Sequence, residues 1–219
     1  VEHICEALEH LFDETDKRMN GLITICDDEE SRGWIQRFIK RGTAVALVDR
    51  GVPIKNLCCC METSSRDMGR LAMNMMEFLT RDDKKGSIVF VNGPDRRVSY
   101  RMYAQAVKEQ MSLMGKGREL IVLNGYEGAK GRNELRELIA AGNVSGVIAG
   151  CARATYWVCD EMNKMAIDDL PPVVGTDVFE ELAPFFENGI LKASIYQSHR
   201  EHGERAMRYL YEVLSNPYM

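Results

Sequence analysis

The stretch VVGTDVFEELAPFFENGILKASIYQSHREHG, residues 173–203, decides the fold. It contains two short apolar runs, and each of them ends in a polar residue: Asp177 closes the first and Gln197 closes the second. A helical segment that contains Gly203 follows the second run. We interpret the two runs as strands of an α/β protein, in which ligands bind outside the carboxyl ends of the strands. Asp177 and Gln197 are therefore the first candidates for ligand-binding residues.

The rest of the chain alternates between amphipathic helices and short apolar strands. Apolar residues at helical spacing predict helices around residues 4–12, 34–39, 68–79, 103–114, 135–139 and 206–214. Apolar runs predict further strands at residues 21–25, 43–48, 58–60, 87–91, 119–123 and 145–149. Strands that are apolar throughout are typical of parallel sheets with helices on both faces, joined by right-handed crossovers. The pattern predicts the α/β class.

Composition limits the possible partners. The chain has 219 residues, of which 45% are hydrophobic, so it can form one large domain or two small ones. Its net charge of -5 provides no basic field with which to hold nucleic acid. No apolar run approaches the roughly 18 residues that a membrane-crossing helix needs, and the first residues do not resemble a secretory signal. We expect no membrane partner and no direct contact with DNA.

The seven cysteines include the run Cys58-Cys59-Cys60 and show no Cys-x-x-Cys spacing. Adjacent residues on a strand point to opposite faces, so the run has poor geometry for a disulfide. We interpret it as a buried strand of free thiols, rather than a metal or redox site, in a reducing compartment. This interpretation favours the cytoplasm over the periplasm.

The sequence contains none of the common catalytic motifs. Gly-x-Ser-x-Gly, Gly-x-x-x-x-Gly-Lys and His-Glu-x-x-His are all missing. His199 and His202 are spaced to share a helical face, but no third metal ligand accompanies them. We therefore expect no enzyme, no metal and no cofactor. The alternative is an enzyme with Cys151 as nucleophile, although no partner base lies near it in the sequence.

Polar residues at the ends of predicted strands form the candidate site. In a parallel sheet these ends share one edge, and carboxylates and guanidinium groups there suit a neutral ligand with many hydroxyl groups. The alternative is that each charged residue only pairs with a neighbour at a helix end. The candidates are Asp49, Arg50, Arg101, Asp177 and Gln197.

Four motifs, in this order, resemble the type I periplasmic-binding-protein fold of ribose-binding proteins and of LacI-type regulator effector domains. They are VDRGVP at 48–53, the Gly-Pro that precedes Arg101, VVGTD at 173–177, and GILKASIYQ at 189–197 with Gly203. The resemblance implies two parallel-sheet α/β lobes joined by crossover strands, with the ligand in the cleft between them. We expect residues 1–62 plus 197–219 in the first lobe and residues 63–196 in the second.

The same resemblance implies roles for individual residues. Asp49, Arg50, Arg101, Asp177 and Gln197 would hydrogen-bond a sugar. Tyr126 falls near the position of a ring that stacks on the ligand. Cys151 stands where the family usually has Asn-Asp, so an amide contact is lost or replaced, which argues against a standard pentose or hexose. The family fold also opens with a strand–helix–strand unit that we expect to be missing here.

These observations lead to one functional expectation and one alternative. We expect the effector-binding domain of a cytoplasmic LacI-type transcription regulator, in which a carbohydrate-like effector alters the geometry of a homodimer. DNA would then be bound only by a headpiece outside this chain. The alternative is a sugar solute-binding protein of an ABC importer. A helix-turn-helix before Val1 would favour the regulator, and a signal or lipoprotein peptide would favour the importer.

Overall fold

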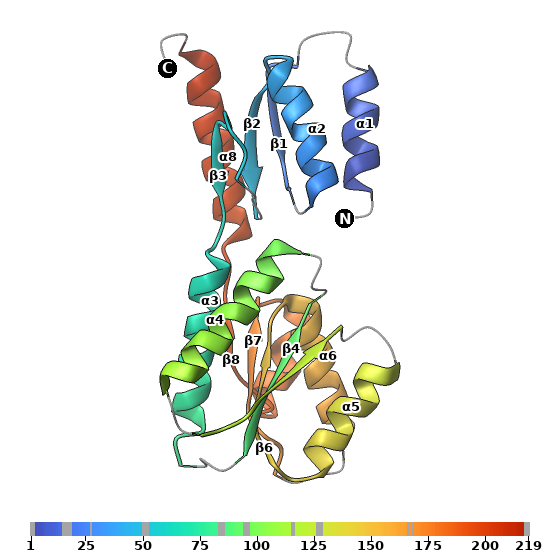
Figure 1. Ribbon diagram of the computed structural model, residues 1–219, viewed down its shortest axis with the longest axis vertical. Helices are drawn as coiled ribbons and strands as arrows, with labels where there is room; N and C mark the ends of the chain where they lie inside the picture. The colour runs from blue at the N-terminus through green and yellow to red at the C-terminus, as the bar shows by residue number, and fades with distance from the viewer. Residues whose placement is uncertain are drawn as a thin grey trace. The chain divides into compact units, whose positions relative to one another are not determined.

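The computed structural model describes residues 3–14, 19–26, 28–49, 53–82, 86–93, 97–114, 117–125, 129–165, 167 and 169–216. The chain divides into two compact units (Figure 1). Unit 1 consists of Val1–Thr63 and Ser198–Met219, and unit 2 consists of Ser64–Gln197. Each unit contains a parallel sheet covered by helices, so the expected α/β class is confirmed.

Unit 1 is built on three parallel strands in the order β1-β2-β3. The strands are β1 Gly21–Thr24, β2 Ala44–Val48 and β3 Cys59–Met61. Two helices, α1 Ile4–Glu14 and α2 Glu29–Lys40, lie on one side of this sheet, and α8 His199–Ser215 lies on the other (Figure 1).

Two leucine side chains of α8 pack closely against Gly21 of β1. A Cβ atom at this position would lie 2.9 Å from a side-chain carbon of Leu214 and 3.0 Å from one of Leu210. A side chain at this position would force the ends of these two leucine side chains to move, so the glycine lets them pack directly against β1.

Unit 2 is built on five parallel strands in the order β5-β4-β6-β7-β8. The strands are β4 Ser87–Asn92, β5 Leu120–Asn124, β6 Val144–Ala149, β7 Val173–Thr176 and β8 Leu191–Ile195. The helices are α3 Ser65–Leu79, α4 Val98–Met114, α5 Ala129–Ala140, α6 Ala152–Asn163, the short 3-10 turn η1 Glu180–Leu182 and α7 Ala183–Glu187.

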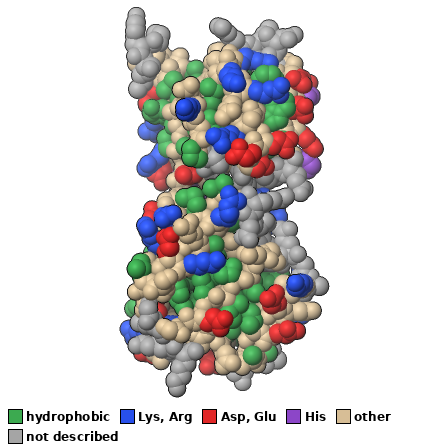
Figure 2. Space-filling model, in the orientation of Figure 1, with side chains coloured by type: hydrophobic (Ala, Val, Ile, Leu, Met, Phe, Trp, Pro, Cys, Tyr) green, Lys and Arg blue, Asp and Glu red, His purple; other side chains and the backbone are tan. Residues whose placement is uncertain are grey.

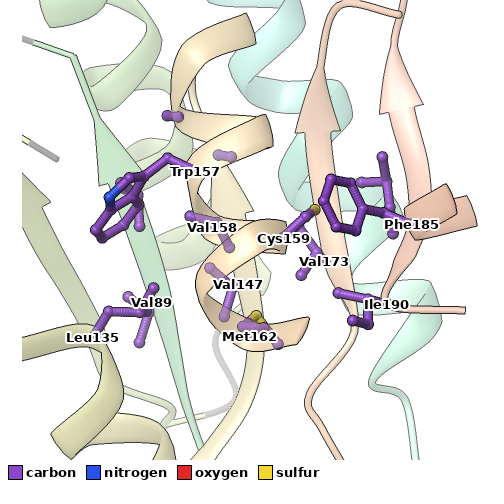
Figure 3. Packing of buried hydrophobic residues seen from close by; sticks show 14 of the residues in the cluster. Val89, Leu135, Val147, Trp157, Val158, Cys159, Met162, Val173, Phe185 and Ile190 are labelled. Atoms are coloured by element: carbon purple, nitrogen blue, oxygen red, sulfur yellow. The ribbon is translucent and has the colours of Figure 1, made fainter. Parts of the chain in front are cut away.

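The sheet of unit 2 has a hydrophobic core on each face, and alternate residues of β4 belong to different cores. Ile88 and Phe90 pack with residues of α3 and α4, whereas Val89 and Val91 pack with residues of α5 and α6. Figure 3 shows the second of these cores, in which Trp157 lies among its aliphatic neighbours. Burial on both faces explains why the strand sequence is apolar throughout, since each fully buried side chain contributes about 1.5–3 kcal/mol.

Two sequence-based interpretations need correction. The run at 58–60 does not form a buried strand: β3 begins at Cys59, which is half-buried, and Cys60 is exposed. These cysteines are accessible because, in the described part of the sheet, β3 is an edge strand with β2 as its one neighbour. Sequence reasoning also missed α6, although Ala154, Trp157 and Val158 mark its buried face at helical spacing.

Candidate ligand-binding site

The carboxyl ends of the five strands of unit 2 lie at one edge of the sheet because all the strands are parallel. We call this the carboxyl edge of unit 2. Cys151 follows β6 there, Asp177 follows β7 and Gln197 follows β8. The structure thus places three of the predicted ligand residues at the same edge.

Asp177 and Gln197 are in direct contact. The side-chain Nε2 of Gln197 donates a hydrogen bond to Asp177 Oδ1 over 2.8 Å, and both side chains are half-buried. A carboxylate oxygen can only accept, so this bond fixes which end of the glutamine amide faces the aspartate. The pair presents preoriented polar groups at the end of two adjacent strands.

The backbone at Asp177 is held in a left-handed conformation, with φ of 69°. Its N–H donates to the carbonyl of Ile195 over 2.8 Å, and its carbonyl accepts a hydrogen bond from Ser194 Oγ. Left-handed residues other than glycine are uncommon and occur often at functional sites, where surrounding contacts hold them in place. Here the contacts to β8 hold the aspartate.

A buried hydrogen-bond network surrounds Thr176, the residue before Asp177. Thr176 Oγ1 donates to the carbonyl of Ala149 over 2.8 Å, so the Tyr103 hydroxyl, 3.1 Å away, must donate to Thr176 Oγ1. The Thr176 N–H donates to Thr155 Oγ1 over 2.8 Å. Burial raises the pKa of the Tyr103 phenol, which keeps it protonated as the donor. The network ties α4, α6 and β6 to the residue that precedes Asp177.

The predicted arginine, Arg101, lies within the first part of α4, and its side chain is exposed. Arg97 immediately precedes α4 and is half-buried. Its Nη1 donates to the Tyr100 hydroxyl over 3.4 Å, and its guanidinium carbon lies 5.5 Å from the centre of that ring. Arg97 is the closer of the two arginines to the end of β4 along the chain. Sequence reasoning passed over it, although an arginine pair directly before a helix was visible.

A second polar residue that sequence reasoning missed is Asn92, the last residue of β4. It is fully buried, and its Nδ2 donates to the carbonyl of Tyr100 over a long 3.5 Å. Within the described part of the chain its Oδ1 has no hydrogen-bond partner. A buried amide oxygen without a partner is costly, so Asn92 is a candidate for contact with a bound molecule or water. The signal was an asparagine that ends an otherwise apolar strand.

Cys151 caps the amino end of α6. Its backbone is extended and its carbonyl accepts a hydrogen bond from the Thr155 N–H over 2.9 Å. The thiol is half-buried and makes no capping bond to the helix. Cys151 thus stands at the junction of β6 and α6, at the carboxyl edge of unit 2.

In unit 1, Asp49 follows β2 with a left-handed φ of 64°, as Asp177 follows β7. Its N–H donates to the carbonyl of Met61 over 3.0 Å. Its carboxylate Oδ1 lies 3.2 Å from Nδ1 of His199, the first residue of α8. Sequence reasoning interpreted His199 as part of an exposed first helical turn, with a metal site as the alternative, and missed this pair.

His202 contacts Thr63, with 3.3 Å between its Nε2 and Thr63 Oγ1. Across the described ranges, no group of three or more His, Cys, Asp or Glu residues is arranged to hold a metal ion. The predicted residues Arg50 and Tyr126 lie outside the described residues.

One face of the molecule shows how its described charged side chains are distributed. Figure 2 shows basic and acidic side chains interspersed over the visible face, with acidic residues and histidines over α1. Of the helices whose residues are described, none is long and apolar enough to cross a bilayer.

A model of the periplasmic binding protein domain matches residues 13–217, which is most of the chain. The chain therefore belongs to the periplasmic binding protein family. No curated protein matches the sequence.

Solved structures with the same fold include proteins of two kinds. The glucose-galactose binding protein GanP from Geobacillus stearothermophilus is 15% identical, with a TM-score of 0.83 over 97% of this chain and 76% of GanP. An ABC transporter solute-binding protein from Burkholderia graminis, in complex with D-arabinose, is 14% identical, with a TM-score of 0.85 over 98% and 75%. A Bacteroides fragilis protein described as a LacI transcriptional regulator is 14% identical, with a TM-score of 0.78 over 95% and 72%. At these identities the likeness shows the fold alone.

Proposed function

We propose that this chain binds a small carbohydrate through polar residues at the carboxyl ends of its strands. The hydrogen-bonded pair of Asp177 and Gln197 is the observation that carries the proposal. A carboxylate accepts hydrogen bonds from sugar hydroxyl groups, and an amide can both donate and accept. The left-handed backbone of Asp177 and the buried network beneath it hold these groups in place before a ligand arrives.

Each unit offers further proposed contacts to a ligand. Arg97 or Arg101 would donate to ring and hydroxyl oxygens, and Asp49 would accept from hydroxyl groups. Asp49 is already oriented by His199, which lies 3.2 Å from its carboxylate. Cys151 would contact the ligand through a thiol, which is a weaker hydrogen-bonding group than an amide. Arg50 and Tyr126 remain proposed contacts from the family resemblance.

We propose the solute-binding component of a sugar importer as the role of this domain. The support comes from its structural relatives, among which GanP is a glucose-galactose binding protein and the Burkholderia protein holds D-arabinose. A solute-binding protein of this kind would act as a monomer that releases its sugar to a transporter.

The effector domain of a cytoplasmic LacI-type regulator is the second candidate. Two observations favour it: the Bacteroides fragilis relative, and seven cysteines that are all free of disulfides. In this role the domain would form a homodimer and reach DNA only through a separate headpiece. Sedimentation equilibrium with and without sugar separates the candidates, because the importer component stays monomeric and the regulator dimerises.

Thermal unfolding in the presence of a ligand panel tests the shared part of the proposal. Pentoses and hexoses, including D-arabinose, D-fucose, glucose and galactose, should give a saturable rise in the melting temperature, because a ligand that binds only the folded state stabilises it. Amino acids and nucleotides serve as the control panel and should give none. If only the control panel raises the melting temperature, the carbohydrate assignment is wrong.

A further inference from the structure

A hollow of about 490 Å³ is lined by residues that lie close in the sequence to Cys151 and Asp177. It is lined by Ala152, Arg153, Tyr156, Phe179 and Glu181, which come from the start of α6 and the segment that follows β7. Ala152 directly follows Cys151, and Phe179 follows closely after Asp177. The lining residues are therefore close neighbours in the sequence of residues at the carboxyl edge. None of them is among the residues assigned above to the sugar site.

Two aromatic rings line this hollow. The Tyr156 side chain is 42% exposed, and its ring meets the buried Phe185 edge-on, with 5.8 Å between ring centres and an angle of 70° between ring planes. Phe179 is half-buried. The Tyr156 ring thus packs on Phe185 while much of the residue stays open to solvent. An exposed aromatic ring that packs on a buried neighbour is suited to stack on the C–H face of a sugar.

Charged side chains accompany the rings. Arg153 and Glu181 are both exposed, and they supply hydrogen-bond donors and acceptors that match sugar hydroxyl groups. An apolar centre with a few polar groups is the usual composition of a small-molecule site, and about 300–1,000 Å³ is the usual volume. The hollow falls within that range.

Two small residues, Cys151 and Ala152, join β6 to α6, and Ala152 lines the hollow. Cys151 and Ala152 occupy the positions where the family resemblance predicts Asn-Asp. Both side chains are short.

We propose that this hollow binds a second sugar ring, so that the ligand of this protein is an oligosaccharide of at least two rings. The proposal rests on the proposed carbohydrate-binding function. The first ring would occupy the site at Asp177 and Gln197, and the second would stack on Tyr156 and Phe179.

Isothermal titration with matched sugars tests the proposal. The panel pairs glucose with cellobiose and maltose, galactose with lactose, and arabinose with arabinobiose. We expect at least one disaccharide to bind about 10-fold more tightly than its own monosaccharide, because stacking adds to the interactions of the first ring. Monosaccharides that bind as tightly as every disaccharide would overturn the second-ring proposal and leave the carbohydrate function standing. If neither class binds, the carbohydrate function itself fails.

Three variants locate the second ring. Tyr156→Ala should remove most of the disaccharide advantage, and Tyr156→Phe should retain it because the ring remains. Phe78→Ala is the matched control, since Phe78 is an exposed aromatic residue of α3, whose buried residues pack in the other core of the sheet. If Tyr156→Ala lowers the affinity for both sugar classes equally, or if Phe78→Ala removes the same advantage, the hollow is not the second-ring site.

Discussion

The amide of Gln197 donates to the carboxylate of Asp177 over 2.8 Å, which joins the residues that follow β7 and β8. Each residue lies at the end of a strand with polar groups that a sugar could use. Their bond means that neither side chain has to be ordered separately when a ligand binds, and ordering a long side chain costs about 0.5–1.5 kcal/mol. Preorganisation of this kind distinguishes a binding site from an exposed polar surface.

The left-handed backbone at Asp49 gives a prediction about stability. Asp49→Ala and Asp49→Gly both remove the carboxylate that lies near His199, so the difference between them reports the backbone alone. At φ of 64°, alanine should make the protein about 1 kcal/mol less stable than glycine does. Urea unfolding of the two variants checks this. Equal stability of the alanine and glycine variants would contradict the left-handed assignment.

The two arginines near the start of α4 should differ in their effect on binding. Arg97 is half-buried and Arg101 is exposed, so Arg97→Ala should lower sugar affinity about 10-fold or more and Arg101→Ala should lower it less. Titration calorimetry on both variants measures the ratio. If Arg101→Ala loses more sugar affinity than Arg97→Ala, then Arg101 is the ligand-binding arginine, as the sequence predicted.

Tyr103→Phe should destabilise unit 2 without disrupting its packing. The phenylalanine keeps the ring but removes the donor to Thr176, whose hydroxyl still donates to Ala149. We expect a loss of about 1 kcal/mol in the free energy of unfolding. Tyr211→Phe, at an exposed tyrosine of α8, is the control and should change nothing. Unfolding in urea that shows no difference between the two variants would mean that the buried network contributes little.

Cys159 gives a prediction about pH. Burial raises the pKa of its thiol from 9.0 to about 12, so the folded state keeps its proton at a pH where the unfolded state loses it. The resulting stabilisation is complete below about pH 9 and is lost as the pH rises toward about 12. Cys159→Ala removes this dependence. Unfolding free energies measured from pH 8 to pH 10.5 should therefore fall more steeply in the wild type than in the variant, and parallel curves would contradict the expectation.

Much of the fold could be predicted because its signals are local. The buried strand at 87–91 and the helix stripe of Met68, Ala72 and Met75 carry their patterns in neighbouring residues, and both elements are present as β4 and α3. The environment of the cysteine run could not be predicted in the same way. Whether β3 lies at the centre or the edge of a sheet depends on strands far away in the sequence, and an edge strand leaves Cys60 exposed.

The site could be predicted in part for the same reason. Strand ends are readable from the sequence, which is how Asp177 and Gln197 were identified as candidates. The contact partner of each side chain cannot be predicted in this way. Asp49 and His199, for example, come from two segments of unit 1 that are far apart in the sequence. The buried oxygen of Asn92 is likewise a property of packing from several elements.

Calorimetric titration of the wild-type protein and of Asp177→Asn with the best sugar of the panel tests the central claim most directly. Asparagine has the same shape but no charge, so the charge-assisted hydrogen bonds to the ligand are weakened, and the affinity should fall about 10- to 100-fold. Asp82→Asn, at a carboxylate with a 94% exposed side chain, should bind as the wild type does. Sugar binding that is saturable in the wild type and unchanged in Asp177→Asn would contradict the account.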